Sequence, residues 1–146
     1  MSEYVFYGWE NADIKDDNGL TLKDYYDILS GIWCAETRAP RMRDKWSADN
    51  KTMGQCSITA FLIQDIFGGF VYGIPRSGGN FHCFNIIEGH VFDLTSEQFK
   101  DEKLDYNNCM IQQRNTHFSK EEKRMRYEYL RSEVIKRTKN KHQEMR

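Results

Sequence analysis

GQCSITAFLIQDIFGG, residues 54–69, is the stretch of sequence that decides the fold. Apolar side chains lie on nearly every side between Cys56 and Phe67, which is typical of a central, buried helix. The Gly68-Gly69 pair predicts the end of that helix. Cys56 stands in its first turn, where unpaired backbone N–H groups and the helix dipole favour an anion. A thiol so placed can have a pKa of roughly 3.5–7.5, which makes it a usable nucleophile.

The segments after this helix predict a small antiparallel sheet. We expect strands over Phe70–Ile74, Phe81–Ile87 and His90–Thr95, with a turn over Pro75–Asn80. A two-residue turn at Glu88-Gly89 would place His82 and Asp93 on one face as diagonal neighbours, about 7–8 Å apart along the backbone. His90 would then point to the opposite face. Cysteine, histidine and aspartate would therefore meet at one place.

These three side chains have the chemistry of a thiol enzyme. His82 would take the proton of Cys56 as an imidazolium, and Asp93 would fix the orientation of the ring. Cys56 would then attack a carbonyl carbon to form a covalent intermediate. The backbone N–H of Cys56 and the amide of Gln55 are the expected oxyanion donors. This pattern predicts a cysteine-dependent hydrolase or acyltransferase acting on an amide, isopeptide or thioester.

The flanking segments predict further helices. Thr21 looks like an N-cap with Asp24 as its partner, and apolar spacing predicts an amphipathic helix over Thr21–Trp33. Ser119 to Glu122 has the form of a capping box before a helix. In that helix we expect Met125, Tyr129, Leu130 and Val134 to face the core. The chain reads as a single α+β domain over 1–146, with an N-terminal arm (1–20) and a solvated basic tail (137–146).

The segment from Cys34 to Met53 has little periodicity and reads as a long, functional loop. We expect Trp46, Arg41, Arg43 and Asn85 to contact the substrate. The same basic and aromatic loop supports an alternative function, a non-enzymatic module that binds a small molecule or a protein on this fold.

Composition excludes several classes of function. Lys and Arg number 21 against 22 Asp and Glu, so no global charge favours nucleic acid or a membrane surface. No leader or membrane span is evident, and we expect a cytoplasmic protein with reduced cysteines. A zinc site would need Cys56, His82, Cys83 and His90. His82 and Cys83 are adjacent on a strand and face opposite ways, so we expect neither zinc nor another cofactor.

The chain resembles the YunG-like family of uncharacterised bacterial proteins. The similar segments are Trp33–Thr37, Trp46-Ser47, Gly54–Ala60, Gln64–Gly69, His82–Asn85, Asp93–Phe99 and Arg126–Leu130, within about Leu22 to Val134. The resemblance implies a shared fold and no established activity. More distantly, the order of Cys56, His82 and Asp93 is similar to that in papain-like and transglutaminase-like enzymes. That likeness implies nucleophile, base and orienting acid at these three positions.

Overall fold

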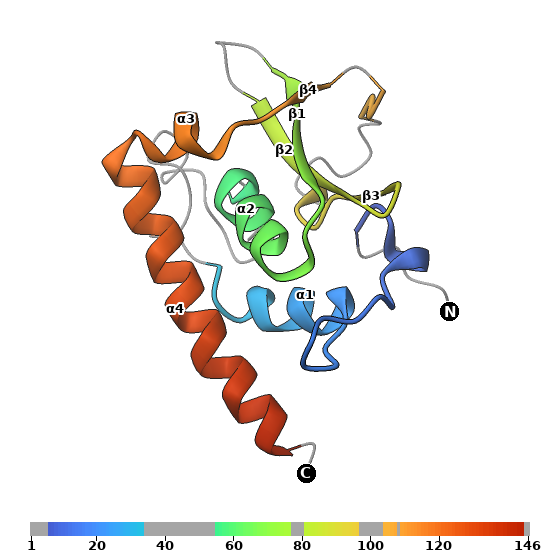
Figure 1. Cartoon of the computed structure of the whole chain (residues 1–146), viewed down its shortest axis with the longest axis vertical. Coiled ribbons are helices and arrows are strands. Elements are labelled where there is room, and N and C mark those ends of the chain that lie inside the picture. The colour runs from blue at the N-terminus through green and yellow to red at the C-terminus, as the bar shows by residue number, and fades with distance from the viewer. Residues whose placement is uncertain (1–5, 34–54, 77–80, 97–103, 108, 145–146) are drawn as a thin grey trace.

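A computed structural model describes residues 6–33, 55–76, 81–96, 104–107 and 109–144, with side chains up to residue 139. Within these residues the chain forms four α-helices, one 3-10 helix and one antiparallel four-stranded sheet, which confirms the α+β class. The elements are η1 (Trp9–Asn11), α1 (Leu22–Ser30), α2 (Cys56–Phe67), β1 (Phe70–Pro75), β2 (Phe81–Ile87), β3 (His90–Phe92), β4 (Met110–Ile111), α3 (Arg114–Phe118) and α4 (Glu121–Glu144). Figure 1 shows α2 at the centre, between the sheet on one side and α1 and α4 on the others. The predicted loop 34–53, most of the predicted turn 75–80 and the first five residues lie outside the described residues.

Helix α2 is the core helix that its sequence predicts. Six consecutive residues, Ile58 to Ile63, are buried, which leaves little room for polar groups around the first two turns. Gly68 ends the helix with a φ of 81°, a left-handed conformation that glycine adopts without steric cost. The predicted end of the helix at Gly68-Gly69 is confirmed. Cys56 is the first residue of this buried helix.

Helix α1 begins as predicted but ends earlier. Thr21 accepts a hydrogen bond from the Asp24 N–H, and the Asp24 carboxylate accepts one from the Thr21 N–H, which is the reciprocal capping box. The helix stops at Ser30 rather than Trp33, because the chain turns at Gly31. Trp33 is nevertheless buried, and its Nε1 donates to the Thr59 hydroxyl of α2 at 3.1 Å.

The sheet has the order β3-β2-β1-β4, and its central pair is long. Glu88 and Gly89 form the two-residue turn between β2 and β3, both with positive φ, and Ile87 pairs with His90. That is the predicted register. Strand β3 ends at Phe92, shorter than predicted, because the backbone N–H of Asp93 donates to the Tyr7 carbonyl instead, at 2.9 Å. Strand β4, which the sequence does not predict, pairs with β1 at the other edge.

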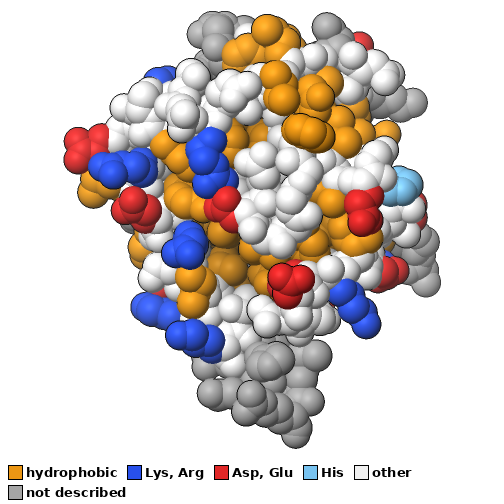
Figure 2. Space-filling view, viewed as in Figure 1, with side chains coloured by type: hydrophobic (Ala, Val, Ile, Leu, Met, Phe, Trp, Pro, Cys, Tyr) orange, Lys and Arg blue, Asp and Glu red, His pale blue; other side chains and the backbone are white. Residues whose placement is uncertain are grey.

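Helix α4 starts directly after the Ser119 region as predicted, and Leu130 and Val134 are buried as expected, but the rest of the predicted core face is not. The residues that reach the core are Tyr127, Leu130 and Val134, at helical spacing. Met125 and Tyr129 are 60% and 50% exposed, so their predicted core positions are wrong. The basic tail predicted over 137–146 is helical as far as Glu144. Figure 2 shows the Lys and Arg side chains that line the outer side of this helix.

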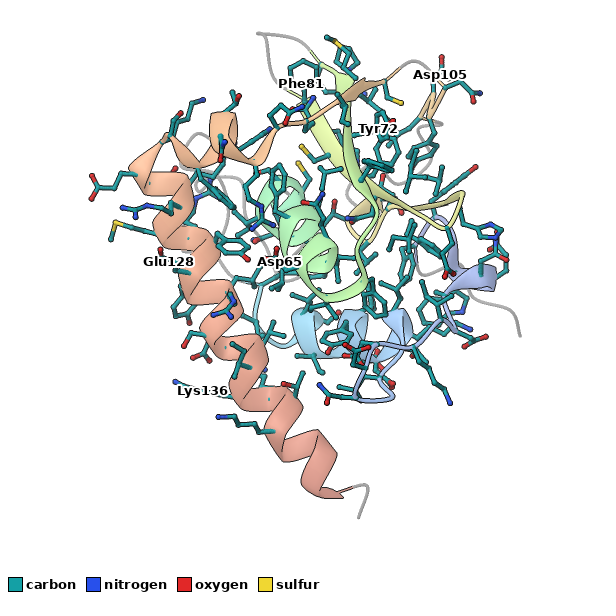
Figure 3. The ribbon with its side chains drawn as sticks, viewed as in Figure 1. Asp65, Tyr72, Phe81, Asp105, Glu128 and Lys136 are labelled. Atoms are coloured by element: carbon teal, nitrogen blue, oxygen red, sulfur yellow. The ribbon has the colours of Figure 1, made fainter. Side chains whose placement is uncertain are left out.

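One partly exposed carboxylate connects the helices. Asp65 of α2 accepts hydrogen bonds from the Tyr127 hydroxyl of α4 and from Arg114 of α3, and Arg114 also donates to the Phe61 carbonyl. Figure 3 shows Asp65 on the part of α2 that lies toward α4. Because a phenol and a guanidinium share one acceptor, this contact fixes α4 against α2. Among the described residues, no helix combines the length and the apolar character needed to cross a membrane.

Candidate active site

The first pair of the site is His82 on β2 and Asp93 just after β3. Nε2 of His82 lies 2.6 Å from Oδ2 of Asp93, and the two side chains are 2% and 0% exposed. The tight Glu88-Gly89 turn produces this contact, because it sets the register that places both residues on one face. Burial shields the pair from water and strengthens the attraction between imidazolium and carboxylate.

Two further residues hold the Asp93 carboxylate in place. The Tyr106 hydroxyl donates to Oδ2 at 2.8 Å, and the Thr95 hydroxyl donates to Oδ1 at 3.4 Å. Tyr106 is itself packed against Tyr7, with ring centroids 4.3 Å apart. The N-terminal segment therefore supports the acid of the site from two directions, through the Tyr7 ring and through the Tyr7 carbonyl.

Cys56 is the first residue of α2, and its thiol lies beside Phe81, the first residue of β2. Its Sγ lies 3.8 Å from the Phe81 carbonyl oxygen, and the side chain is partly exposed. Figure 3 shows Phe81 at the end of β2 near the start of α2. Cys56 thus contacts the residue that precedes His82 in β2, and it stands at the end of α2 where the dipole favours a thiolate.

Two neighbours stabilise the thiolate form of Cys56. The buried Cys83 thiol, which donates a hydrogen bond to the Cys56 sulfur, and the His82 ring lower the pKa of Cys56 well below its ordinary value. Burial opposes them but does not prevail. The same hydrogen bond to Cys56, together with burial, raises the pKa of Cys83 well above its ordinary value. Cys56 is therefore the acidic thiol of the two.

The base of the site is strongly cationic. Burial lowers the pKa of His82, but the Asp93 carboxylate and then the Cys56 sulfur outweigh it and raise that pKa to about 10. Because Nε2 binds Asp93, Nδ1 is the ring nitrogen left for the thiol. These shifts favour a thiolate beside an imidazolium, the form in which a thiol acts as a nucleophile.

The structure brings together three of the residues predicted from sequence, Cys56, His82 and Asp93. Gln55 is fully buried immediately before Cys56, and its role as an oxyanion donor stays a prediction. Trp46, Arg41 and Arg43 lie outside the described residues.

Asn85 has a contact that is internal to the protein. Its Nδ2 donates to the carbonyl of Ala60 in α2 at 2.8 Å, and the residue is 2% exposed. This bond ties β2 to α2 and uses the amide for packing of the two elements. Its predicted contact with substrate stays a prediction.

Sequence reasoning missed Cys83 and Tyr106 as members of the site. The alternation of side chains along β2 could have predicted Cys83. It places Cys83 on the face opposite His82, which is the face that α2 covers. Nothing local to Tyr106 predicts its bond to Asp93, which is 13 residues away in the sequence.

Other kinds of site lie elsewhere or are not formed. A pocket of about 280 Å³, lined by Asp16, Asp65, Arg131 and their neighbours, lies along the second half of α2, away from Cys56 at its start. Within the part of the chain that the structure describes, no group of three or more His, Cys, Asp or Glu side chains is placed to hold a metal ion.

Comparison with known proteins identifies the family. The family model described as YunG protein matches residues 21–139, which is most of the chain. The uncharacterized protein YunG of Bacillus subtilis (strain 168) is 38% identical over 73 residues, which cover 50% of this chain and 58% of that protein. No solved structure matches the chain significantly. Since its family model covers far more than half of the chain, including Cys56, His82 and Asp93, this protein belongs to the YunG family.

Proposed function

We propose that this protein is a cysteine-dependent hydrolase or acyltransferase that acts on an amide, isopeptide or thioester. The observation that carries the proposal is the position of His82, which binds Asp93 through one ring nitrogen and interacts with Cys56 as well. A Cys-bearing helix packed against an antiparallel sheet that carries the histidine also supports a papain-like or transglutaminase-like relationship.

The proposed reaction has two halves. The Cys56 thiolate attacks the carbonyl carbon, and the carbonyl electron pair moves to oxygen, where the Cys56 N–H and the Gln55 amide are the proposed donors. The tetrahedral intermediate collapses as the bond to the leaving amine or thiol breaks, and His82 transfers its proton to that group. A thioester to Cys56 remains. Water or an amine, deprotonated by His82, then attacks this thioester and releases Cys56 as a thiolate.

Alkylation of the thiol tests the proposal without a known substrate. At pH 6 an ordinary thiol is almost fully protonated, so iodoacetamide should give a single adduct at Cys56 by intact mass and peptide mapping. His82→Ala should slow this reaction by about tenfold. The unmodified protein has more thiolate at pH 6 than the variant, but part of that advantage is lost because a more acidic thiol is a weaker nucleophile. His90→Ala is the matched control, since His90 is exposed on β3. Slow, uniform labelling of all four cysteines would contradict the proposal.

A second measurement separates catalysis from binding. Cys56→Ser removes the nucleophile while keeping a side chain of similar size, so it should abolish turnover of any substrate found by screening. Ligand-induced shifts of Tm should survive in the same variant. If Cys56→Ser keeps full activity in every assay, the protein is a binding module and not a thiol enzyme.

A further inference from the structure

A second hydrogen-bonded group consists of Lys123, His117 and Gln112, and the reaction proposed above does not use it. Lys123 Nζ lies 2.8 Å from His117 Nδ1, and His117 Nε2 lies 2.8 Å from Gln112 Oε1. The amide oxygen of Gln112 can only accept, so Nε2 carries the ring proton and Nδ1 accepts from the lysine ammonium. Burial and the charge of Lys123 lower the pKa of His117 to about 4, which keeps this ring neutral.

This group is connected to the site through Gly73 and Phe81. A Cβ added at Gly73 would meet the Gln112 side chain at 2.8 Å and the Phe81 Cβ at 2.9 Å, so glycine here lets Gln112 lie against the sheet next to Phe81. Phe81 is the residue whose carbonyl contacts the Cys56 sulfur. Burial lowers the pKa of Lys123, and the nearby Cys83 and Cys56 sulfurs oppose this lowering.

Lys123 is held in place by a neutral partner. Within the described residues, no carboxylate lies within ion-pair distance of its ammonium group. His117 takes one of its three N–H groups, which leaves two for another acceptor. A partly buried cation that is oriented in advance binds an anion without the usual loss of side-chain freedom.

We propose that Lys123, oriented by His117 and Gln112, is a subsite for a carboxylate of the substrate attacked by Cys56. The inference rests on the proposed function and gives it a substrate class, acyl compounds with a free carboxylate close to the attacked carbon. A lysine suits this role because its ammonium acts as a point charge and does not require a planar partner.

A pair of alkylating agents that differ in charge tests the subsite. Iodoacetate carries a carboxylate next to its reactive carbon, and iodoacetamide is its neutral analogue. The ratio of their rates at Cys56 measures attraction of the carboxylate, because any change in the thiol itself affects both rates and cancels. Lys123→Met should lower the ratio of iodoacetate to iodoacetamide by about tenfold, the size expected for one hydrogen bond to a charged group. Lys123→Arg should keep most of the ratio.

The control lies on the same helix. Lys136 is an exposed lysine of α4, far from Phe81 in Figure 3, so Lys136→Met should leave the ratio unchanged. In the unmodified protein, added NaCl should slow iodoacetate selectively, which provides a test that needs no variant. An unchanged ratio in Lys123→Met, with fast iodoacetamide labelling of Cys56, would overturn the subsite and leave the thiol chemistry intact. Failure of Cys56 to react with either agent would instead overturn the proposed function.

Discussion

Nε2 of His82 in β2 lies 2.6 Å from Oδ2 of Asp93, the residue that follows β3, and both side chains are buried. The contact leaves the other ring nitrogen for the thiol of Cys56 at the start of α2. Such a buried arrangement of charges has consequences for stability, for reactivity and for the effect of pH, and each of these can be measured.

The stability of the protein should have a plateau in pH that this pair defines. The ordinary pKa values are 6.5 for His82 and 9.0 for Cys56, whereas folding raises the first to about 10 and lowers the second. Between pH 6.5 and 9 the unfolded chain binds one proton on the thiol and the folded chain binds one on the imidazole, so the pair contributes no slope. Below pH 6.5 the unfolded chain binds one proton more than the folded protein, and above pH 9 it binds one proton fewer. The free energy of unfolding should therefore fall on both sides, by about 1.4 kcal/mol per pH unit from this pair.

Cys56→Ser gives this prediction a sharp control. Without the thiol, the folded protein binds one more proton than the unfolded chain as soon as the pH exceeds 6.5, because only the raised pKa of His82 remains. The decline in stability should then begin near pH 6.5 instead of pH 9. Urea unfolding at a series of pH values measures both curves. Parallel curves for the two proteins would show that Cys56 is not charged at neutral pH.

Asp93→Asn should damage both stability and reactivity. The amide keeps the shape of the side chain but leaves the buried His82 ring without its anion, so the ring loses its proton and the thiolate loses its partner. We expect the free energy of unfolding to drop by about 3 kcal/mol. Alkylation of Cys56 at pH 6 should slow by about tenfold, as in His82→Ala.

Tyr106→Phe is the matched variant for Asp93. It removes one hydrogen bond to the carboxylate and keeps its charge, so stability should fall by about 1.5 kcal/mol and most of the reactivity should remain. Equal loss of reactivity in Tyr106→Phe and Asp93→Asn would mean that the charge of Asp93 is not what matters.

Cys83 should tune the acidity of Cys56. Cys83→Ala removes the thiol that donates to the Cys56 sulfur, so the pKa of Cys56 should rise, and the pH dependence of its alkylation should shift to higher pH. Cys83→Ser keeps a donor at this position and should shift the profile less. The opposite order of the two variants would exclude the hydrogen bond as the cause.

Asn85 should behave as a structural residue. Asn85→Ala removes the bond from β2 to the Ala60 carbonyl, which should lower the free energy of unfolding by about 1–2 kcal/mol. The alkylation rate of Cys56 should stay the same. Normal stability combined with altered reactivity would instead support the predicted contact with substrate.

Much of the fold is encoded by local signals. The apolar run after Cys56, the glycines that end it and the Glu88-Gly89 turn suffice to place α2, β2 and β3 in their observed register. The buried face of α4 is predicted only in part, since Leu130 and Val134 are buried as expected whereas Met125 and Tyr129 are exposed. Tyr127 is buried whereas Tyr129 is exposed, and the Tyr127 hydroxyl donates to the Asp65 carboxylate of α2. This contact joins residues 62 apart in the sequence, so no local pattern predicts it.

The residues of the site also fall into those that local sequence patterns predict and those that they do not. His82 and Asp93 follow from counting along a hairpin, and Cys56 follows from its place at a helix start. Tyr106, which holds Asp93, and Lys123, which bonds to His117, belong to segments with no strand or helix pattern that points at the thiol. Only tertiary packing of β4, α3 and α4 against the sheet and α2 brings Lys123 to the site.

The charge state of Cys56 at neutral pH is the central claim, and ultraviolet absorbance of the thiolate near 240 nm measures it directly. The spectrum of the protein at pH 7 is compared with that of Cys56→Ser, so that the other cysteines cancel. We predict an excess absorbance of about one thiolate in the unmodified protein, persisting toward acid pH and lost in His82→Ala. Identical spectra at pH 7, with a thiolate forming only near the ordinary cysteine pKa of 9.0, would contradict the account.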